Sequence, residues 1–161
     1  TKEEFLALVD KMRSRIPDLS LSTDVIVGFP TETDEEFEDT VDVMRKVQFD
    51  QAFMFKYSER KGTIASKKFP DDISEETKSL RVTKLVNMQK DIVYERNKSF
   101  VGKVCNVLVE PAIGDKSPQN TVARTDGNHL VIIADASYPI GSIVKVKVID
   151  ATPHVLRAVV V

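Results

Sequence analysis

The sequence predicts two successive folds joined by a helix. Residues 1–73 are expected to form part of an α/β barrel with parallel strands, and residues 99–161 a small all-β, OB-like barrel. The first prediction rests on residues 1–57, which alternate helical and strand patterns, the order typical of a parallel α/β sheet. The second rests on short β-rich runs separated by Gly and Pro. Residues 74–98 are expected to be the connecting helix.

Two capping boxes mark where helices begin in the first part. Thr1 with Glu4, and Thr33 with Glu36, have the Ser/Thr-x-x-Glu spacing in which each partner satisfies a free backbone N–H of the other. Apolar residues at helical spacing follow each box. Pro17 ends the first helix, because the residue before a proline is pushed out of the helical region.

The apolar run Val25–Val27 is expected to be a strand buried on both faces, since it does not alternate with polar residues. Gly28 and Pro30 then turn the chain, and 49–57 forms a second strand. Two parallel strands leave open edges and cannot cover both of their faces. They are therefore expected to be the end of a larger barrel whose beginning is missing. The chain, which starts with Thr1, is then expected to self-associate or to leave its sheet poorly covered.

The middle of the chain is expected to be a loop followed by a long helix. Residues 58–73 are rich in charge and turn formers, and Ser74 caps a helix that runs to about Lys98. One face of this helix consists of Lys, Arg, Glu and Asn and is expected to face solvent. Its buried stripe is predicted to contain Val82, Leu85, Val86, Gln89, Ile92, Val93 and Arg96.

The tail from Ser99 is expected to hold five antiparallel strands. Asp126-Gly127 is a hairpin signal, and Lys145 and Lys147 alternate with valines to give one basic and one buried face. OB-like barrels often bind single-stranded nucleic acid or RNA loops, although a structural or dimerising β-domain has the same composition. The predicted strands are Val104–Val109, Thr121–Arg124, His129–Ile133, Ile143–Ile149 and Val155–Val161.

Composition restricts the class of protein. Of the 161 residues, 30% are charged and 42% hydrophobic, which indicates a soluble globular chain. Residues 99–161 carry six basic and five acidic side chains, so charge alone does not predict nucleic-acid binding. A single Cys favours a reducing, cytoplasmic location, and with two His it predicts no metal site in this chain. No apolar run is long enough to span a membrane.

The order of motifs resembles the radical S-adenosylmethionine methylthiotransferases. The resemblance is carried by Ser22–Thr33 and the acidic helix start after it, by Phe49–Ser58, and by Arg60–Thr63. The tail, with Val101–Val104 and Ala123–Asn128, resembles the C-terminal TRAM domain of this family. Together these motifs cover essentially the whole chain. The resemblance implies the last portion of a radical S-adenosylmethionine barrel followed by a TRAM domain.

The string Ala52–Ser58 resembles the branch of the family that acts on tRNA, where isopentenyl-adenosine beside the anticodon receives a 2-methylthio group. A sibling branch acts on a ribosomal-protein aspartate, and usually has an acidic pair where Arg60 and Lys61 stand. The chain departs from the family at Thr31, where Gly is usual, and at Lys61, where Pro is usual. The implied partner is a tRNA anticodon stem-loop.

The family's cofactors are S-adenosylmethionine and 4Fe-4S clusters. The resemblance implies that the clusters are bound by a missing N-terminal part, which comprises the rest of the barrel and a methylthiotransferase domain. The Cys-x-x-x-Cys-x-x-Cys motif is absent here, and Cys105 matches none of its positions. The chain alone is therefore expected to be inactive, with no catalytic residue and no metal ligand of its own.

The resemblance also suggests binding residues. S-adenosylmethionine is expected to contact Asp24, Ile26, Gly28 and Pro30, although Ile26 also suits a core, and Gly28 and Pro30 a simple turn. Each candidate for RNA contact also suits an ordinary exposed or half-buried polar position. These candidates are Lys56, Tyr57, Arg60 and Lys61 after the second strand, and Lys103, Arg124, Asn128, His129, Lys145, Lys147 and Arg157 in the tail.

Two other hypotheses remain open from the sequence. The chain could be a stand-alone RNA-binding module in which residues 99–161 read RNA and residues 1–98 serve as a scaffold. It could also be a structural or dimerising domain without a ligand. Binding of RNA that weakens with added salt would separate these two hypotheses.

Overall fold

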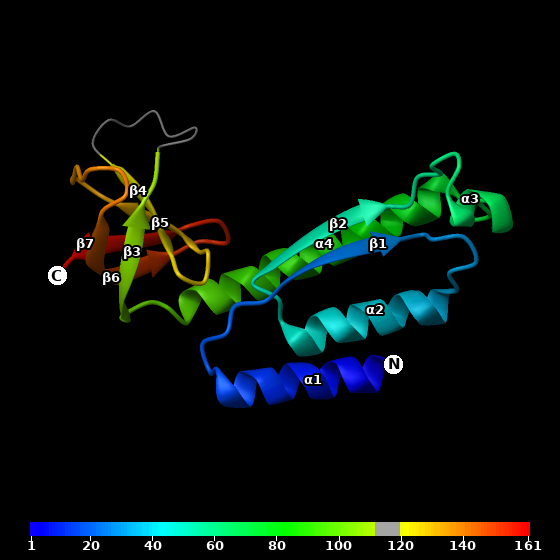
Figure 1. Ribbon diagram of the computed structural model, residues 1–161, viewed down its shortest axis with the longest axis horizontal. Helices are drawn as coiled ribbons and strands as arrows, with labels where there is room; N and C mark the ends of the chain where they lie inside the picture. Colours follow the sequence, from blue (N-terminus) through cyan, green and yellow to red (C-terminus); the bar gives the residue numbers. More distant parts are fainter. Residues whose placement is uncertain (112–119) are drawn as a thin grey trace. The chain divides into compact units, whose positions relative to one another are not determined.

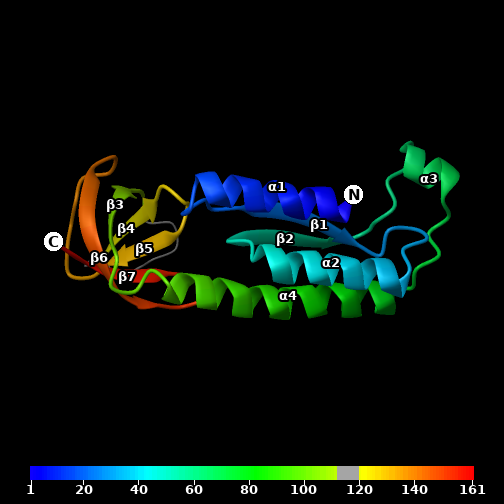
Figure 2. The ribbon, with the colours of Figure 1, turned by 90° about the horizontal axis from the view of Figure 1, so that it is seen from below.

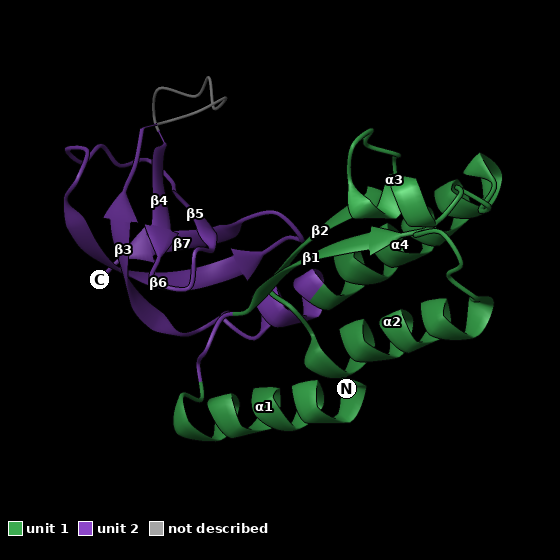
Figure 3. Ribbon diagram, turned by 45° about the vertical axis from the view of Figure 1, so that its right-hand side comes forward, with its two compact units in different colours: residues 1–17, 21–92 green, residues 18–20, 93–161 purple. Residues whose placement is uncertain are grey.

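A computed structural model describes residues 1–111 and 120–161, and Figure 1 shows its elements. The described chain divides into two compact units (Figure 3). Unit 1 consists of residues 1–17 and 21–92, and unit 2 of residues 18–20 and 93–161.

Unit 1 contains two parallel strands, with helices running alongside them (Figure 2). Asp24 lies opposite Phe53, and Ile26 opposite Phe55. These two strands do not themselves form a barrel. The elements of this part of the chain are α1 (Lys2–Arg15), β1 (Ser22–Val27), α2 (Asp34–Val47), β2 (Gln51–Lys56), α3 (Ile64–Lys68) and α4 (Glu75–Lys98).

Both predicted capping boxes are present and begin α1 and α2. The Thr33 hydroxyl accepts from the Glu36 N–H at 3.2 Å, and the Glu36 carboxylate accepts from the Thr33 N–H at 2.8 Å. At the other end of α2, Gln48 ends the helix in a left-handed conformation (φ 54°), and Val47 before it is buried.

The core of unit 1 lies on one face of the β1–β2 sheet. Val27 packs there with residues of α1, α2 and α4, including Val9, Met44 and Leu85. The opposite face is open, because Ile26, Phe53 and Phe55 are 57%, 55% and 52% exposed. The prediction that the first strand is buried on both faces is therefore wrong for this chain, and so is a core role for Ile26. The expected poorly covered sheet is confirmed.

The region after β2 holds two features that the sequence did not predict. The short helix α3 lies within the expected loop, where the Thr63 hydroxyl caps it by accepting from the Ser66 N–H at 3.2 Å. In α4, the lysines and arginines outside the predicted stripe were expected to face solvent, yet Lys78 and Arg81 are 1% and 6% exposed. Gln89 is buried, as predicted, and its side-chain amide donates to the Phe49 carbonyl at 2.8 Å.

Unit 2 contains a closed five-stranded barrel with the order β3-β4-β5-β7-β6. All five predicted strands are confirmed. The barrel is not wholly antiparallel as expected, because β5 and β7 pair in parallel. Inward-pointing valines such as Val107, Val131 and Val146 form its core. The strands are β3 (Val104–Val109), β4 (Thr121–Thr125), β5 (Leu130–Ile133), β6 (Ile143–Ala151) and β7 (Leu156–Val160).

The predicted hairpin joins β4 to β5, and its left-handed residue is not the glycine of the Asp126-Gly127 signal. Asn128, rather than Gly127, has the positive φ of 67°. The Asn128 N–H donates to the Thr125 carbonyl at 3.0 Å, and the Thr125 N–H to the His129 carbonyl at 3.1 Å. This is the pattern of a three-residue loop that ends in a left-handed residue. Asn tolerates that conformation better than most side chains.

Candidate functional site

A hollow of about 490 Å³ lies along the carboxyl-terminal part of β1 and β2 and the chain that follows β2 in unit 1. Its volume is within the range of small-molecule sites. Its position also fits, because α/β folds bind ligands at the carboxyl ends of parallel strands. The residues that line it are Asp24, Ile26, Phe55, Lys56, Tyr57, Ser58, Arg60, Thr63 and Ala65.

The hollow brings together two groups of residues singled out in the sequence. Asp24 and Ile26 were expected to contact S-adenosylmethionine, and Lys56, Tyr57 and Arg60 to contact RNA. The exposed Lys56 ammonium donates to Glu75 at 3.0 Å and to the Ser79 hydroxyl at 3.3 Å. Lys61 is exposed and is not among the lining residues, and neither are the buried Gly28 and Pro30.

Tyr57 is the most enclosed polar residue of this hollow. Its side chain is 9% exposed, and its hydroxyl is buried without a hydrogen-bond partner among the residues that the structure describes. The ring meets the edge of Phe29, with centroids 5.1 Å apart, and lies 5.5 Å from the Lys78 ammonium. A buried hydroxyl without a partner costs stability. The ring of Tyr57, and not its buried hydroxyl, is therefore the part that the hollow offers to a ligand.

The loop after β1 is held by two buried cations of α4. The Gly28 N–H donates to the Glu32 carboxylate at 2.6 Å, which in turn accepts from Arg81 at 2.6 Å. Lys78 lies against Gly28 and pairs with Asp71 at 2.5 Å. Burial on its own lowers the pKa of Lys78, but the nearby carboxylates, Asp71 above all, leave that pKa above its ordinary value.

These cations were missed in the sequence, although a signal was present. Lys78 and Arg81 continue the buried stripe of α4 toward its N-terminus, at helical spacing from Leu85. A long cationic side chain on such a stripe is usually solvated at its tip, so its burial depends on carboxylates supplied from elsewhere. Glu32 and Asp71 lie 49 and 7 residues away from their partners.

Thr31 has an unusual backbone. Its φ is 74°, in the left-handed region that favours glycine, and its N–H donates to the Asp72 carboxylate at 2.8 Å. The methylthiotransferases that the sequence resembles usually have Gly at this position. The conformation gives that preference a physical reason, since a side chain here costs about 1–2 kcal/mol.

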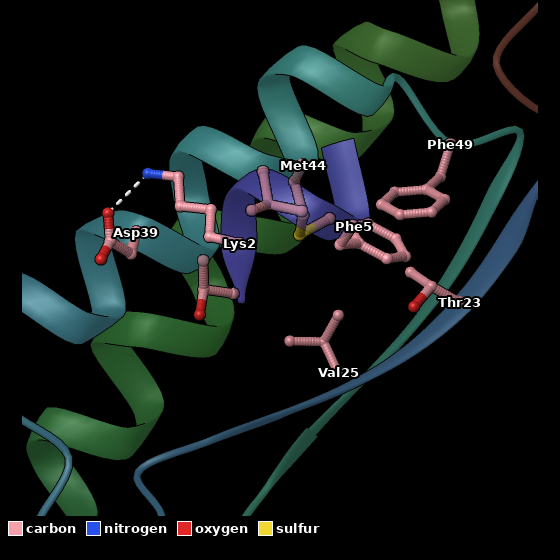
Figure 4. Close-up of a pocket in the computed structure, with 9 residues that line it drawn as sticks. Lys2, Phe5, Thr23, Val25, Asp39, Met44 and Phe49 are labelled. Atoms are coloured by element: carbon pink, nitrogen blue, oxygen red, sulfur yellow. Dashed lines mark hydrogen bonds and ion pairs between the residues drawn. The ribbon is translucent and has the colours of Figure 1, made fainter. Parts of the chain in front are cut away.

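A second hollow, of about 270 Å³, lies among α1, α2 and β1 on the helix side of the sheet (Figure 4). Phe5, Val25 and Met44 contribute to its largely apolar lining. Its two charged residues, Lys2 and Asp39, pair with each other at 2.5 Å. It therefore offers a ligand mainly apolar contact.

The residues present suit only one of the two expected cofactors. Among residues 1–111 and 120–161, no group of three or more His, Cys, Asp or Glu is arranged to hold a metal ion. Cys105 is half-buried in β3, and burial, with a smaller effect of Asp126, raises the pKa of its thiol. The described residues therefore do not fit an iron–sulfur cluster. The hollow does suit a nucleoside-sized ligand, because it combines the apolar side chains of Ile26 and Phe55 with the exposed carboxylate of Asp24.

In unit 2, Lys145 and Lys147 point outward from β6, while Val144, Val146 and Val148, which alternate with them, point into the barrel. Asn106 is in register with Lys145, and Val104 and Val159 flank Lys147. Within the described part of the chain, neither lysine has an ion-pair partner. The predicted basic face of this strand is thus present.

The other predicted RNA contacts of unit 2 already have partners within that unit. Arg124 donates to Glu110 at 2.9 Å and to the Asn128 carbonyl at 3.1 Å. The His129 ring lies 3.1 Å from the Asn97 side-chain oxygen and 4.5 Å from the Phe100 centroid. Lys103 and Arg157 are 4.0 Å from Asp18 and Asp150, respectively.

The comparisons concern first the barrel and then the chain as a whole. Residues 98–161 match the family described as the TRAM domain. The chain as a whole is similar to three curated proteins, each called tRNA-2-methylthio-N(6)-dimethylallyladenosine synthase. The protein of Flavobacterium johnsoniae is 40% identical over 157 residues, which are 98% of this chain and 32% of the relative. That of Caldicellulosiruptor saccharolyticus is 41% identical over 162 residues (100% and 34%), and that of Acetivibrio thermocellus 46% over 149 (92% and 30%).

This similarity confirms the resemblance to the C-terminal regions of tRNA methylthiotransferases that the sequence motifs indicated. The chain spans about a third of the length of the curated relatives it matches. In the described ranges, no helix is both long and apolar enough to cross a membrane.

Proposed function

We propose that this chain is the part of a tRNA-methylthiolating enzyme that completes its radical S-adenosylmethionine barrel and holds its tRNA. The observation that carries the proposal is the open face of the β1–β2 sheet. Helices cover one side, while Ile26, Phe53 and Phe55 stand exposed on the other. A strand pair covered on one side only suits the wall of a barrel, where the bare side faces inward. The relatives' names and the TRAM domain support tRNA as the substrate.

On this proposal the hollow at the carboxyl ends of the strands holds S-adenosylmethionine. When bound at a reduced cluster held elsewhere in the enzyme, S-adenosylmethionine supplies the radical chemistry. The residues of this chain bind and orient it. Asp24 would accept a hydrogen bond from a ribose hydroxyl, Ile26 would pack against the adenine, and the Tyr57 ring would add a further contact.

A chimaera tests this proposal. This chain replaces the segment that it matches in the Caldicellulosiruptor protein, and cells that lack their own activity are assayed for methylthiolated tRNA by mass spectrometry. We expect modified tRNA. We also expect Asp24→Asn to lower the rate about 10-fold or more, because a charge-assisted hydrogen bond is lost. Asp10→Asn, an exposed change on α1, is the matched control. A well-folded chimaera that loads its cluster without modifying tRNA would contradict the proposal.

The open face makes a separate prediction for the isolated chain. Phe53→Ser with Phe55→Ser should reduce self-association and the binding of an apolar dye, because both rings are about half exposed. The free energy of unfolding should change by no more than about 1 kcal/mol. Sedimentation, dye fluorescence and urea unfolding measure these effects. Phe37→Ser, at a residue 5% exposed, should instead destabilise the unit strongly. Unchanged dye binding in the double variant would contradict the open face.

A further inference from the structure

We infer that the barrel of unit 2 binds RNA through the phosphate backbone of a double-helical stem, and not by stacking unpaired bases. The inference rests on the proposed function, because it takes RNA as the partner of this unit. It specifies which part of an RNA hairpin the barrel contacts. Two properties of the outer face of the barrel support it: few aromatic side chains and two exposed lysines.

The described strands of the barrel present no stacking surface. OB-like proteins that bind single strands place successive bases on aromatic side chains. None of the five strands here contains an aromatic residue. Phe100 and Tyr138 are half-buried and pack against the barrel core. His129 is held between Asn97 and Phe100. His154 is exposed, and so is Tyr94 of α4, whose ring already lies 4.7 Å from the Lys98 ammonium. These two isolated rings, neither of them on a barrel strand, do not form a platform for successive bases.

The outer face does offer cations. Lys145 and Lys147 are exposed, two residues apart on one strand, so their Cα atoms lie about 7 Å apart. Within the described residues no carboxylate pairs with either of them, whereas Arg124 is paired with Glu110. Two flexible ammonium groups along one line suit successive phosphates. Double-stranded RNA is bound mainly through its phosphates and 2′-hydroxyls, which need no aromatic platform.

The test uses the full chain and three RNA probes with the same number of nucleotides: a hairpin, a blunt duplex and an unstructured uridine strand. Dissociation constants are measured at several salt concentrations. We expect the duplex and the hairpin to bind alike, and the uridine strand about 10-fold more weakly. Lys145→Gln with Lys147→Gln should weaken duplex binding and reduce the salt slope by about 2, one for each lost phosphate contact.

The control variant carries the same change of charge elsewhere. Lys11→Gln with Lys90→Gln alters two exposed lysines of unit 1 and should leave the salt slope unchanged. Thermal unfolding verifies that both variants fold. A uridine strand that binds as tightly as the duplex, or a slope unaffected by the β6 variant, overturns the inference while RNA binding stands. Failure of all three probes to bind at low salt overturns both the inference and the proposed role of this unit in holding tRNA.

Discussion

Replacing Gly28 with alanine is expected to destabilise unit 1 by about 2–5 kcal/mol, the largest effect that we predict. Two costs add. Gly28 has a φ of 68°, which strains any residue with a Cβ, and the new methyl group would overlap the Cγ of Lys78. Lys78 cannot move aside freely, because its side chain is buried and pairs with Asp71. Urea unfolding of the purified chain measures the change.

Gly62→Ala separates the two costs. Gly62 also has a positive φ, of 90°, but nothing lies within 4 Å of the added Cβ. This variant should lose only the conformational part, about 1–2 kcal/mol. Equal losses in the two variants would show that the contact between Gly28 and Lys78 contributes nothing.

The second large effect is expected for Asp71→Asn. The Lys78 side chain is 1% exposed, and Asp71 is its nearest counter-charge, with Glu75 more distant at 3.4 Å and itself largely exposed. Removing the carboxylate leaves a buried ammonium poorly compensated. We expect a loss of about 2 kcal/mol at neutral pH, below the range for fully buried pairs because Asp71 is partly solvated. Glu38→Gln, which breaks the exposed pair with Lys84, should cost no more than about 0.5 kcal/mol.

The loss should depend on pH, and its sign follows from the pKa of Lys78. In the native chain the carboxylates raise this pKa, so their contribution is complete below the ordinary pKa of lysine and disappears as the pH rises through the raised value. Burial is already the largest single influence on this pKa, and in Asp71→Asn only Glu75 opposes it, so the pKa of folded Lys78 is expected to fall. The folded variant then releases a proton that the unfolded chain keeps, and its stability rises with pH. The difference between the two proteins should therefore shrink from pH 7 toward pH 10. A constant difference would contradict a charged, buried Lys78.

Local signals in the sequence were sufficient for most of the fold. The capping box at Thr33 and the alternation of Lys145 and Lys147 with valines each depend on residues a few positions apart. The burial of Ile26 was mispredicted for a different reason. Its apolar neighbours describe a strand that suits cover on both sides, whereas only one side is covered by described residues of this chain. Periodicity reports what a strand can bury, and not whether a partner is present.

The candidate site was predictable where it follows the ends of strands. Asp24 and Tyr57 were singled out through the family resemblance, which implies binding residues on and directly after such strands, and the hollow contains both. The contacts that hold the loop at Gly28 were not predictable, because they depend on an ion pair between Arg81 and Glu32, which are 49 residues apart in the sequence. Ion pairs between distant segments leave no local pattern. The preference for glycine at Thr31 became clear only once its φ was known.

The two sheets of the described chain differ in whether another strand can pair with them. In the closed barrel of unit 2 every strand has two neighbours, so no row of backbone N–H and C=O groups is left to bind another strand. The β1–β2 ribbon has a free margin on each side. Strand addition, productive or aberrant, is thus confined to the ribbon. A short peptide that mimics a strand should therefore bind to the edge of the β1–β2 sheet and not to the closed barrel. Such a peptide could label or cap unit 1 selectively.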